Sequence, residues 1–250
     1  GVLNLGESQE NPQDNALQLA FPFNTFQNFD LTPDGDLWAI GDSLMYLKGL
    51  ENSWVQYPGW GKHLIANNQE TLTFNQRNAF RVLKIDHKNY VREVFVPGVR
   101  ALDFHRDLYG KLWMSGTHGA YAFDTDQLAA TKLPFLESEI RVNCLHSDST
   151  YLYGATFGKG VFQYHLRDST VRWITTKDGL TSNTSSAITL DPSGKLWVGT
   201  NRGLCVFQSS DAGWELVKTI QDFAGFKARK VNCQLTNRGF MWIGTEMGLW

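Results

Sequence analysis

The sequence has few cysteines, and none of them lies at a spacing typical of a metal site. It contains three, Cys144, Cys205 and Cys233, and an odd number does not give a fully paired disulfide framework. Cys144 and Cys233 occur in the matching words VNCL and VNCQ. We therefore expect free, buried thiols, two of them at equivalent positions of two strands.

The sequence also lacks a long apolar run and an excess of charge of either sign. No stretch approaches the roughly 18 apolar residues that a membrane-spanning helix needs. The 23 basic and 25 acidic residues give a formal net charge of −2. A nucleic-acid partner requires a sustained basic surface, so we expect none. Any attachment to a membrane would use segments outside this chain.

The motifs of common enzyme and metal-binding classes are absent. The six histidines include no pair at the i, i+4 spacing of a helical metal site, and no HExxH, GxSxG, Walker or GxGxxG motif occurs. The cluster His105, Arg106 and Asp107 could titrate, but we interpret it as a solvated loop. We expect no catalytic residue, no metal site and no cofactor, and we predict that the chain itself is not an enzyme.

The sequence does contain a recurring word that combines an aromatic residue with glycine. Its anchors are Trp38, Trp113, Tyr153, Trp197 and Trp242, which lie 75, 40, 44 and 45 residues apart. The gap of 75 is nearly two periods, and it holds a degenerate copy with TLTF at 71–74 and AFRVLKID at 79–86. About six repeat units are therefore visible, the last of them incomplete.

Each unit is predicted to contain four short strands. In the fifth unit these are SAITLD (186–191), LWVGT (196–200), GLCVF (203–207) and WELVKT (214–219). Four antiparallel strands in each period of 40–45 residues are typical of a propeller blade. A sandwich or barrel also uses many short strands, but it does not require the same word in each quartet. We predict an all-β fold, a β-propeller of four-stranded antiparallel blades, with the repeated tryptophans in the core between blades.

The stretch GLTSNTSSAITLDPSGKLWVGTNRGLCVF (179–207) resembles the regulator-propeller repeat. That repeat is typical of the extracytoplasmic sensor regions of hybrid two-component system histidine kinases of the Bacteroidetes type. The sixth unit matches in MWIGTEMGL, while the other units match more loosely. The resemblance spans about residues 26–250 and implies a propeller array truncated within its last unit. Residues 1–25 are an N-terminal segment, and residues 17–29 are a possible closing strand for the last blade.

The resemblance also implies a function. It predicts a ligand-sensing module on the periplasmic or extracellular face of the inner membrane, which recognises a saccharide-type signal and passes it to a downstream kinase. Its partners would be a small-molecule or oligosaccharide ligand and a second copy that pairs through propeller faces. The alternative is a non-signalling extracytoplasmic scaffold that binds a protein partner. A propeller lyase would need catalytic side chains that converge on the central axis.

Binding residues are expected in the loops. Because strands alternate in direction, the connections between second and third strands emerge on the same face as the links between blades. We call this the loop face. Its mixture of an aromatic, amides and charges suits a saccharide, although any single residue could simply be an exposed loop residue. The candidates are His118, Phe157, Lys159, Asn201, Arg202, Glu246, Arg141 and Asn183.

Overall fold

The computed structural model describes most of the chain after residue 25. The described residues are 26–32, 36–41, 44–47, 54–57, 61, 63–68, 71–76, 79–85, 91–97, 100–125, 127, 129–136, 140–210, 213–223, 226–227, 231–237, 240–245 and 248–249. The chain divides into two compact units. The first comprises Gly1–Phe74 and Leu83–Val91, and the second comprises Asn75–Val82 and Arg92–Trp250.

The first unit contains the first blade, a four-stranded antiparallel sheet in the order β1-β2-β3-β4. Its strands are β1 (Phe26–Leu31), β2 (Leu37–Gly41), β3 (Leu44–Leu47) and β4 (Trp54–Tyr57). All of β2 is buried, and Trp38 is a core residue as predicted. The amide of Ala66 in β5 (Leu64–Asn68) donates a 2.8 Å hydrogen bond to the Asp30 carboxylate of β1.

A second sheet contains β5, β6 (Thr71–Gln76), β7 (Ala79–Ile85) and β8 (Val91–Pro97) in that order. It corresponds to the degenerate repeat, since TLTF falls in β6 and the first seven residues of AFRVLKID form β7. A blade therefore forms here without the Trp-Gly word, from strands that still contain β-branched and aromatic residues.

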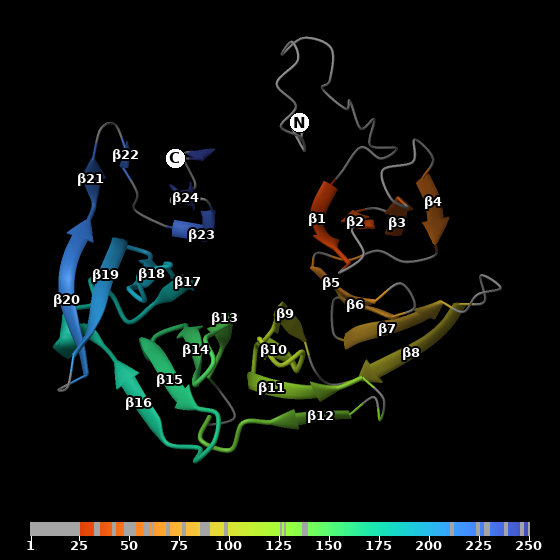
Figure 1. The fold of residues 1–250 in the computed structure, drawn as a ribbon, viewed down its shortest axis with the longest axis horizontal. Coiled ribbons are helices and arrows are strands. Elements are labelled where there is room, and N and C mark those ends of the chain that lie inside the picture. Colours follow the sequence, from red (N-terminus) through yellow and green to blue (C-terminus); the bar gives the residue numbers. More distant parts are fainter. Residues whose placement is uncertain are drawn as a thin grey trace, which may run out of the picture. The chain divides into compact units, whose positions relative to one another are not determined.

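The second unit holds the remaining blades (Figure 1). The third blade has β9 (Ala101–Arg106), β10 (Leu112–Gly116), β11 (Gly119–Asp124) and β12 (Ala129–Lys132). The fourth has β13 (Val142–Ser147), β14 (Tyr151–Thr156), β15 (Val161–His165) and β16 (Val171–Ile174). The fifth has β17 (Ser185–Leu190), β18 (Leu196–Thr200), β19 (Gly203–Ser210) and β20 (Gly213–Ile220). Each forms one antiparallel sheet in chain order.

A short hairpin and a sixth sheet follow. The hairpin has β21 (Asp222–Phe223) and β22 (Phe226–Lys227), and the sheet has β23 (Val231–Asn237), β24 (Phe240–Thr245) and β25 (Gly248–Leu249). The repeated sheets confirm the predicted β-propeller of four-stranded antiparallel blades. In the described part of the chain the helical structure is limited to the 3-10 turn η1 (Thr176–Asp178). No helix in that part is long and apolar enough to cross a membrane.

The first strands of successive blades in the second unit lie next to one another. β13 contacts both β9 and β17, and β17 contacts β23. A β-bulge lies near the start of each of these strands, and in β13 and β17 the side chain of the bulged residue reaches the neighbouring blade. The bulged Asn143 donates a 2.7 Å hydrogen bond from its side-chain amide to the Ser185 carbonyl. Ser186 bonds in the same way to the Val231 carbonyl.

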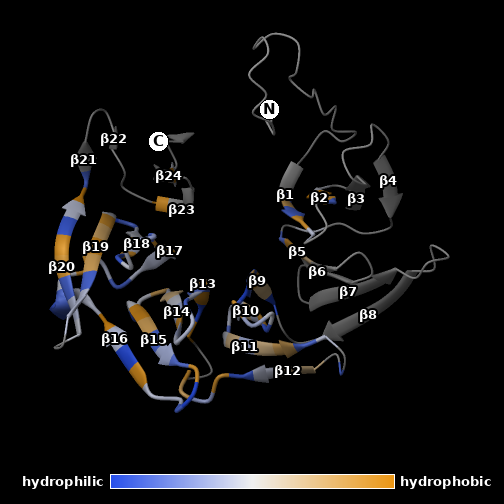
Figure 2. Cartoon of the chain, in the orientation of Figure 1, coloured by the Kyte–Doolittle hydropathy of each residue, from blue (hydrophilic) through white to orange (hydrophobic). Residues whose placement is uncertain are grey.

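Apolar side chains fill the space between these blades. Trp113 is buried in a cluster with Leu145 and Phe162 of the fourth blade. Tyr153 is buried with Ile188 and Phe207 of the fifth blade. Figure 2 shows hydrophobic colour over one part of β19, which is buried from Gly203 to Phe207, whereas β16 and β20 mix hydrophobic and hydrophilic residues. The middle strands therefore form the core and the fourth strands face solvent.

The other repeated aromatics fit this core less fully. Trp197 is only partly buried against the cluster shared by the fifth and sixth blades, and the Trp242 side chain lies outside the described part. Cys144 and Cys205 are free thiols, as predicted, and Cys205 is buried while Cys144 is half-buried. Residues 17–25 of the predicted closing strand lie outside the described residues. Residues 26–29 belong to β1, which pairs with β2 of its own blade.

Candidate functional site

A buried aspartate organises the turn between the first two strands of the third blade. Asp107 Oδ1 accepts the backbone amides of Tyr109 and Lys111 at 3.0 and 2.9 Å. Its Oδ2 accepts the indole N–H of Trp113 at 2.9 Å. Asp107 is only 6% exposed, so the interpretation of this residue as part of a solvated loop was wrong. Gly110 closes the turn at a φ of 82°, which favours glycine.

An aspartate makes equivalent hydrogen bonds in the turns of the next two blades. In the fifth blade Asp191 accepts the amides of Ser193 and Lys195 and, at 2.9 Å, the indole of Trp197. Desolvation acts to raise the pKa of Asp191, but these hydrogen bonds outweigh it and lower the pKa. In the fourth blade, Asp148 accepts the hydroxyl of Tyr153 at 2.8 Å. Burial and then this hydrogen bond raise the pKa of Tyr153.

The turns of the third and fourth blades enclose a pocket of about 550 Å³. The third blade contributes Asp107, Tyr109, Lys111 and Trp113, and the fourth contributes Ser149, Thr150, Tyr164, His165, Leu166 and Arg167. Tyr109 bridges the two blades, because its hydroxyl donates a 3.1 Å hydrogen bond to the Ser149 carbonyl. Lys111 places its ammonium 4.4 Å from the centroid of the Trp113 ring, at the distance of a cation–π contact.

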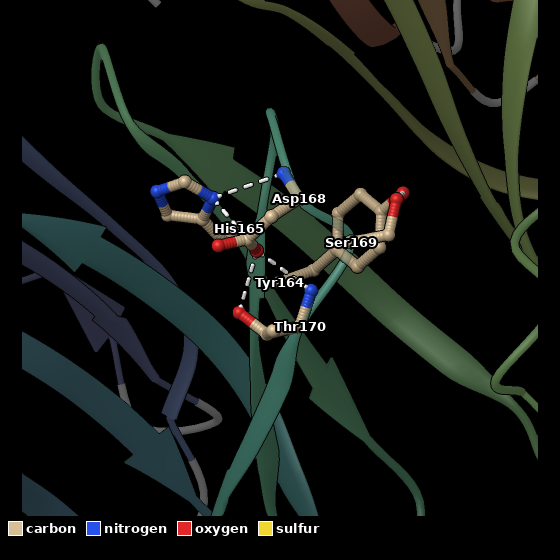
Figure 3. A network of polar contacts seen from close by, with 5 residues as sticks. All are labelled: Tyr164, His165, Asp168, Ser169 and Thr170. Carbon is tan, nitrogen blue, oxygen red and sulfur yellow. Dashed lines mark hydrogen bonds and ion pairs between the residues drawn. The ribbon is translucent and has the colours of Figure 1, made fainter.

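The chain from the end of β15 into the turn before β16 contributes Tyr164, His165, Leu166 and Arg167 to this pocket. Figure 3 shows the polar contacts of this turn. Asp168 Oδ1 accepts the amide and the hydroxyl of Thr170 at 3.0 and 2.7 Å. These donors, and then the nearby His165, lower the pKa of Asp168. His165 Nδ1 lies 2.9 Å from Asp168 Oδ1 and 3.2 Å from the Asp168 amide. It donates to the carboxylate when protonated and accepts from the amide when neutral.

Titratable side chains of β9 and β13 lie next to one another. His105 Nε2 is 2.8 Å from the Ser147 hydroxyl, and its ring is 5.5 Å from that of His146. His105 lies in β9 and is half-buried, so this residue does not belong to a solvated loop either. Burial, and then the charge of His146, lower the pKa of His105 to about 4. Burial raises the pKa of Asp103 to about 7, against amide hydrogen bonds from Phe104 and Leu145.

The loop face forms as predicted at the opposite ends of the strands. The amide of Phe157 donates to the Arg141 carbonyl at 2.9 Å, and the amide of Asn201 donates to the Thr184 carbonyl at 3.2 Å. The Asn183 carbonyl accepts the amides of Gly158 and Gly160, on either side of Lys159. The connections between second and third strands therefore lie against the links between blades.

Most of the predicted site residues are exposed on this face. Their side chains are exposed at His118, Phe157, Lys159, Asn201, Arg202 and Arg141, while Asn183 is half-buried. The hydrogen bonds bring Arg141, Phe157 and Asn183 together, and Arg202 is tied to the next link through Gln221. Glu246 lies outside the described residues. The structure gives these residues a common face, and their role in binding stays a prediction.

None of the predicted site residues lines the pocket. The alternation of strand direction places the pocket, which is built from turns between first and second and between third and fourth strands, at the other end of the blades. The sequence does contain a signal for the turn that forms part of this pocket. The turns Asp-Leu-Tyr-Gly-Lys-Leu-Trp (107–113) and Asp-Pro-Ser-Gly-Lys-Leu-Trp (191–197) differ at two positions only. Groups of side chains able to hold a metal ion are absent from the described part of the chain.

Comparison with known proteins agrees with the blade geometry. Residues 179–202 match the family described as Two component regulator propeller. These residues include β17 and β18, the strand that contains Trp197. No curated protein sequence matches the chain.

Solved structures share the fold at low sequence identity. Two are extracellular domains from B. thetaiotaomicron. One, of a putative hybrid two component system, is 17% identical with a TM-score of 0.63 and covers 90% of this chain and 38% of its own. The other, of a putative one component system, is 14% identical with a TM-score of 0.71 and covers 90% and 32%. This chain thus spans about a third of their length.

A third similar structure is virginiamycin B lyase from Staphylococcus aureus. It is 15% identical with a TM-score of 0.65, and the match covers 89% of this chain and 78% of the lyase. Identities at this level carry the fold alone, so the repeat match is the more specific finding. The chain is a β-propeller, and residues 179–202, which include the first two strands of its fifth blade, match the two component regulator propeller family.

Proposed function

We propose that this chain is a ligand-sensing extracytoplasmic propeller module of a two-component signalling protein. It recognises a saccharide-type signal and passes it to a downstream kinase. The pocket between the third and fourth blades carries this proposal. It has room for a small saccharide, and it combines an exposed aromatic ring with hydroxyl and charged groups, as small-molecule sites commonly do.

Two comparisons support the signalling context. The fifth blade matches the regulator repeat, and similar folds occur in extracellular domains of putative two component systems from B. thetaiotaomicron. We therefore place the chain on the periplasmic or extracellular face of the inner membrane. We also propose that two copies pair through propeller faces. Ligand binding could then shift the equilibrium between two arrangements of the pair, if the ligand binds one of them more tightly.

We propose binding rather than catalysis. The carboxylate inside the pocket, Asp107, already accepts three hydrogen bonds, so it is not free to act as a general acid or base. The lyase shares the fold, and fold alone does not transfer an activity.

The test is calorimetric titration of the chain with a panel of oligosaccharides. Thermal shift provides a second readout, because a ligand at a hundred times its Kd adds about 2.7 kcal/mol of stability. We expect binding that Tyr109→Ala weakens and Phe157→Ala on the loop face leaves unchanged. Loss of binding in Phe157→Ala alone would move the site to the loop face. If no oligosaccharide binds, the saccharide-sensing proposal fails and the protein-binding scaffold takes its place.

A further inference from the structure

The turn between the first two strands of the third blade can be compared with the matching turn of the fifth blade. Both turns keep the aspartate, the glycine, the lysine and the tryptophan, and the two glycines have φ values of 82° and 80°. The fifth blade fills the two remaining positions with Pro192 and Ser193, whereas the third has Leu108 and Tyr109. The scaffold of the turn therefore does not require these two apolar side chains.

Leu108 and Tyr109 are nevertheless highly exposed, at 74% and 73%. Large apolar side chains contribute to folding when they are buried, so these two contribute little to it. The ring of Tyr109 is also held in place. Its backbone amide bonds to Asp107, and its hydroxyl bonds to the Ser149 carbonyl of the next blade. A fixed, exposed ring beside a pocket suits a ligand with a flat apolar face, because little side-chain freedom is lost on binding.

The charges of the pocket favour an anion. Within the described part of the chain, Lys111 and Arg167 line the pocket without an ion pair to a carboxylate. The one acidic lining residue, Asp107, is buried and engaged by three donors. Asp168, the residue after Arg167, is engaged by Thr170 and His165. A carboxylate or sulfate in the pocket would gain charge-assisted hydrogen bonds from both cations.

We propose that the pocket between the third and fourth blades binds an acidic saccharide. The sugar ring stacks on Tyr109, and Lys111 and Arg167 hold the carboxylate or sulfate. This inference rests on the proposed sensing function and narrows its ligand.

The experiment is calorimetric titration with three oligosaccharides of equal length: one of uronic acids, one sulfated and neutral in its other groups, and one neutral. We expect an acidic oligosaccharide to bind at least about tenfold more tightly than the neutral one. Its affinity should fall as salt rises, because ions screen the charges. Binding of the uronic or the sulfated ligand identifies which anion the pocket takes, and either supports the proposal.

The repeat provides matched variants. Lys111→Ala should weaken binding of the acidic ligand by about tenfold, while Lys195→Ala at the equivalent position of the fifth blade should not. Tyr109→Ser copies the fifth-blade turn, so it should fold normally and lose affinity for every ligand. If the neutral oligosaccharide binds as tightly as the acidic ones and Lys111→Ala changes neither affinity, the preference for an acidic ligand is wrong and the sensing function still stands. Absence of any binding would overturn both.

Discussion

The indole nitrogen of Trp113 donates a 2.9 Å hydrogen bond to the carboxylate of Asp107, six residues earlier in the chain. Trp197 and Asp191 repeat this relationship at the same distance and spacing. In both turns one carboxylate oxygen takes backbone amides and the other takes the indole. This explains the aspartate that follows the first strand in the third and fifth blades, since an amide side chain offers only one acceptor oxygen.

Replacing this aspartate should destabilise the fold. Asp107→Ala leaves the buried indole of Trp113 and two turn amides without their acceptor. An unsatisfied buried donor costs about 1–3 kcal/mol, and we expect a loss of about 2 kcal/mol in the free energy of unfolding, measured in urea. Asp124→Ala is the control, because the exposed Asp124 accepts the amide of Gln127, and it should cost less. A double-mutant cycle with Trp113→Phe should show coupling. Additive losses would contradict the pairing.

The glycine of the LWVGT word should be intolerant of a methyl group. A Cβ at Gly199 would lie 2.6 Å from Cγ1 of Val231, in the first strand of the next blade. Overpacking of this kind costs about 1–3 kcal/mol, so Gly199→Ala should lower the urea midpoint. Val231→Ala removes Cγ1 but leaves Cβ 2.8 Å from the added methyl group, so it relieves part of the overlap, and the double variant should lose less stability than the sum of the two single ones. If the stability loss of the double variant equals the sum of the two single losses, the added methyl group does not contact Val231.

Much of this fold was predictable, because each blade repeats the same pattern. The word LWVGT predicted β18 with correct bounds, and WELVKT fell within β20. The fourth blade shows the limit. There Gly154 and Ala155 occupy the positions that Val198 and Gly199 have in the fifth blade. The larger side chain of the pair lies on the third strand in the fourth blade and on the second strand in the fifth. Phe162 lies opposite Gly154, whereas the smaller Cys205 lies opposite Val198. Such an exchange of volume is visible only once the strand register is known.

The pocket was not predictable in the same way. Its walls come from turns at residues 107–113 and 149–150 and at 164–167, on two blades. Strand direction predicted which connections share a face, and it predicted the loop face correctly. It did not indicate which face is hollowed, because that depends on how closely two neighbouring turns approach and on the bond from Tyr109 to Ser149.

The bulged residues of the first strands should contribute to cohesion between blades. Asn143 donates to the Ser185 carbonyl and accepts from Nε of Arg141 at 2.8 Å. Asn143→Ala should cost about 1 kcal/mol, the usual net value of one hydrogen bond. Asn143→Asp should cost more, because it turns an acceptor toward the carbonyl. Equal losses for the two variants, measured by urea unfolding, would contradict a role of the donated bond.

The protonation of Asp103 should make stability depend on pH. Burial raises its pKa from 3.8 to about 7, so the folded protein keeps a proton that the unfolded chain releases. The stability that Asp103 contributes is therefore complete below pH 4 and lost as pH rises through about 7. His105 acts in the opposite direction, because burial lowers its pKa from 6.5 to about 4. Its contribution is present above pH 6.5 and lost as pH falls toward 4.

Asp103→Asn separates these two effects. The variant keeps the buried hydrogen-bonding shape without an ionisable group, so it should gain stability relative to the parent between pH 4 and pH 8, by on the order of 2–4 kcal/mol. Urea unfolding at several pH values measures the difference. Asp168→Asn is the control of opposite sign, since hydrogen bonds from Thr170 lower the pKa of Asp168 and its stabilisation is lost only as pH falls. If the Asp103→Asn difference were constant from pH 4 to pH 8, Asp103 would be ionised in the folded protein, and its burial would not govern its titration.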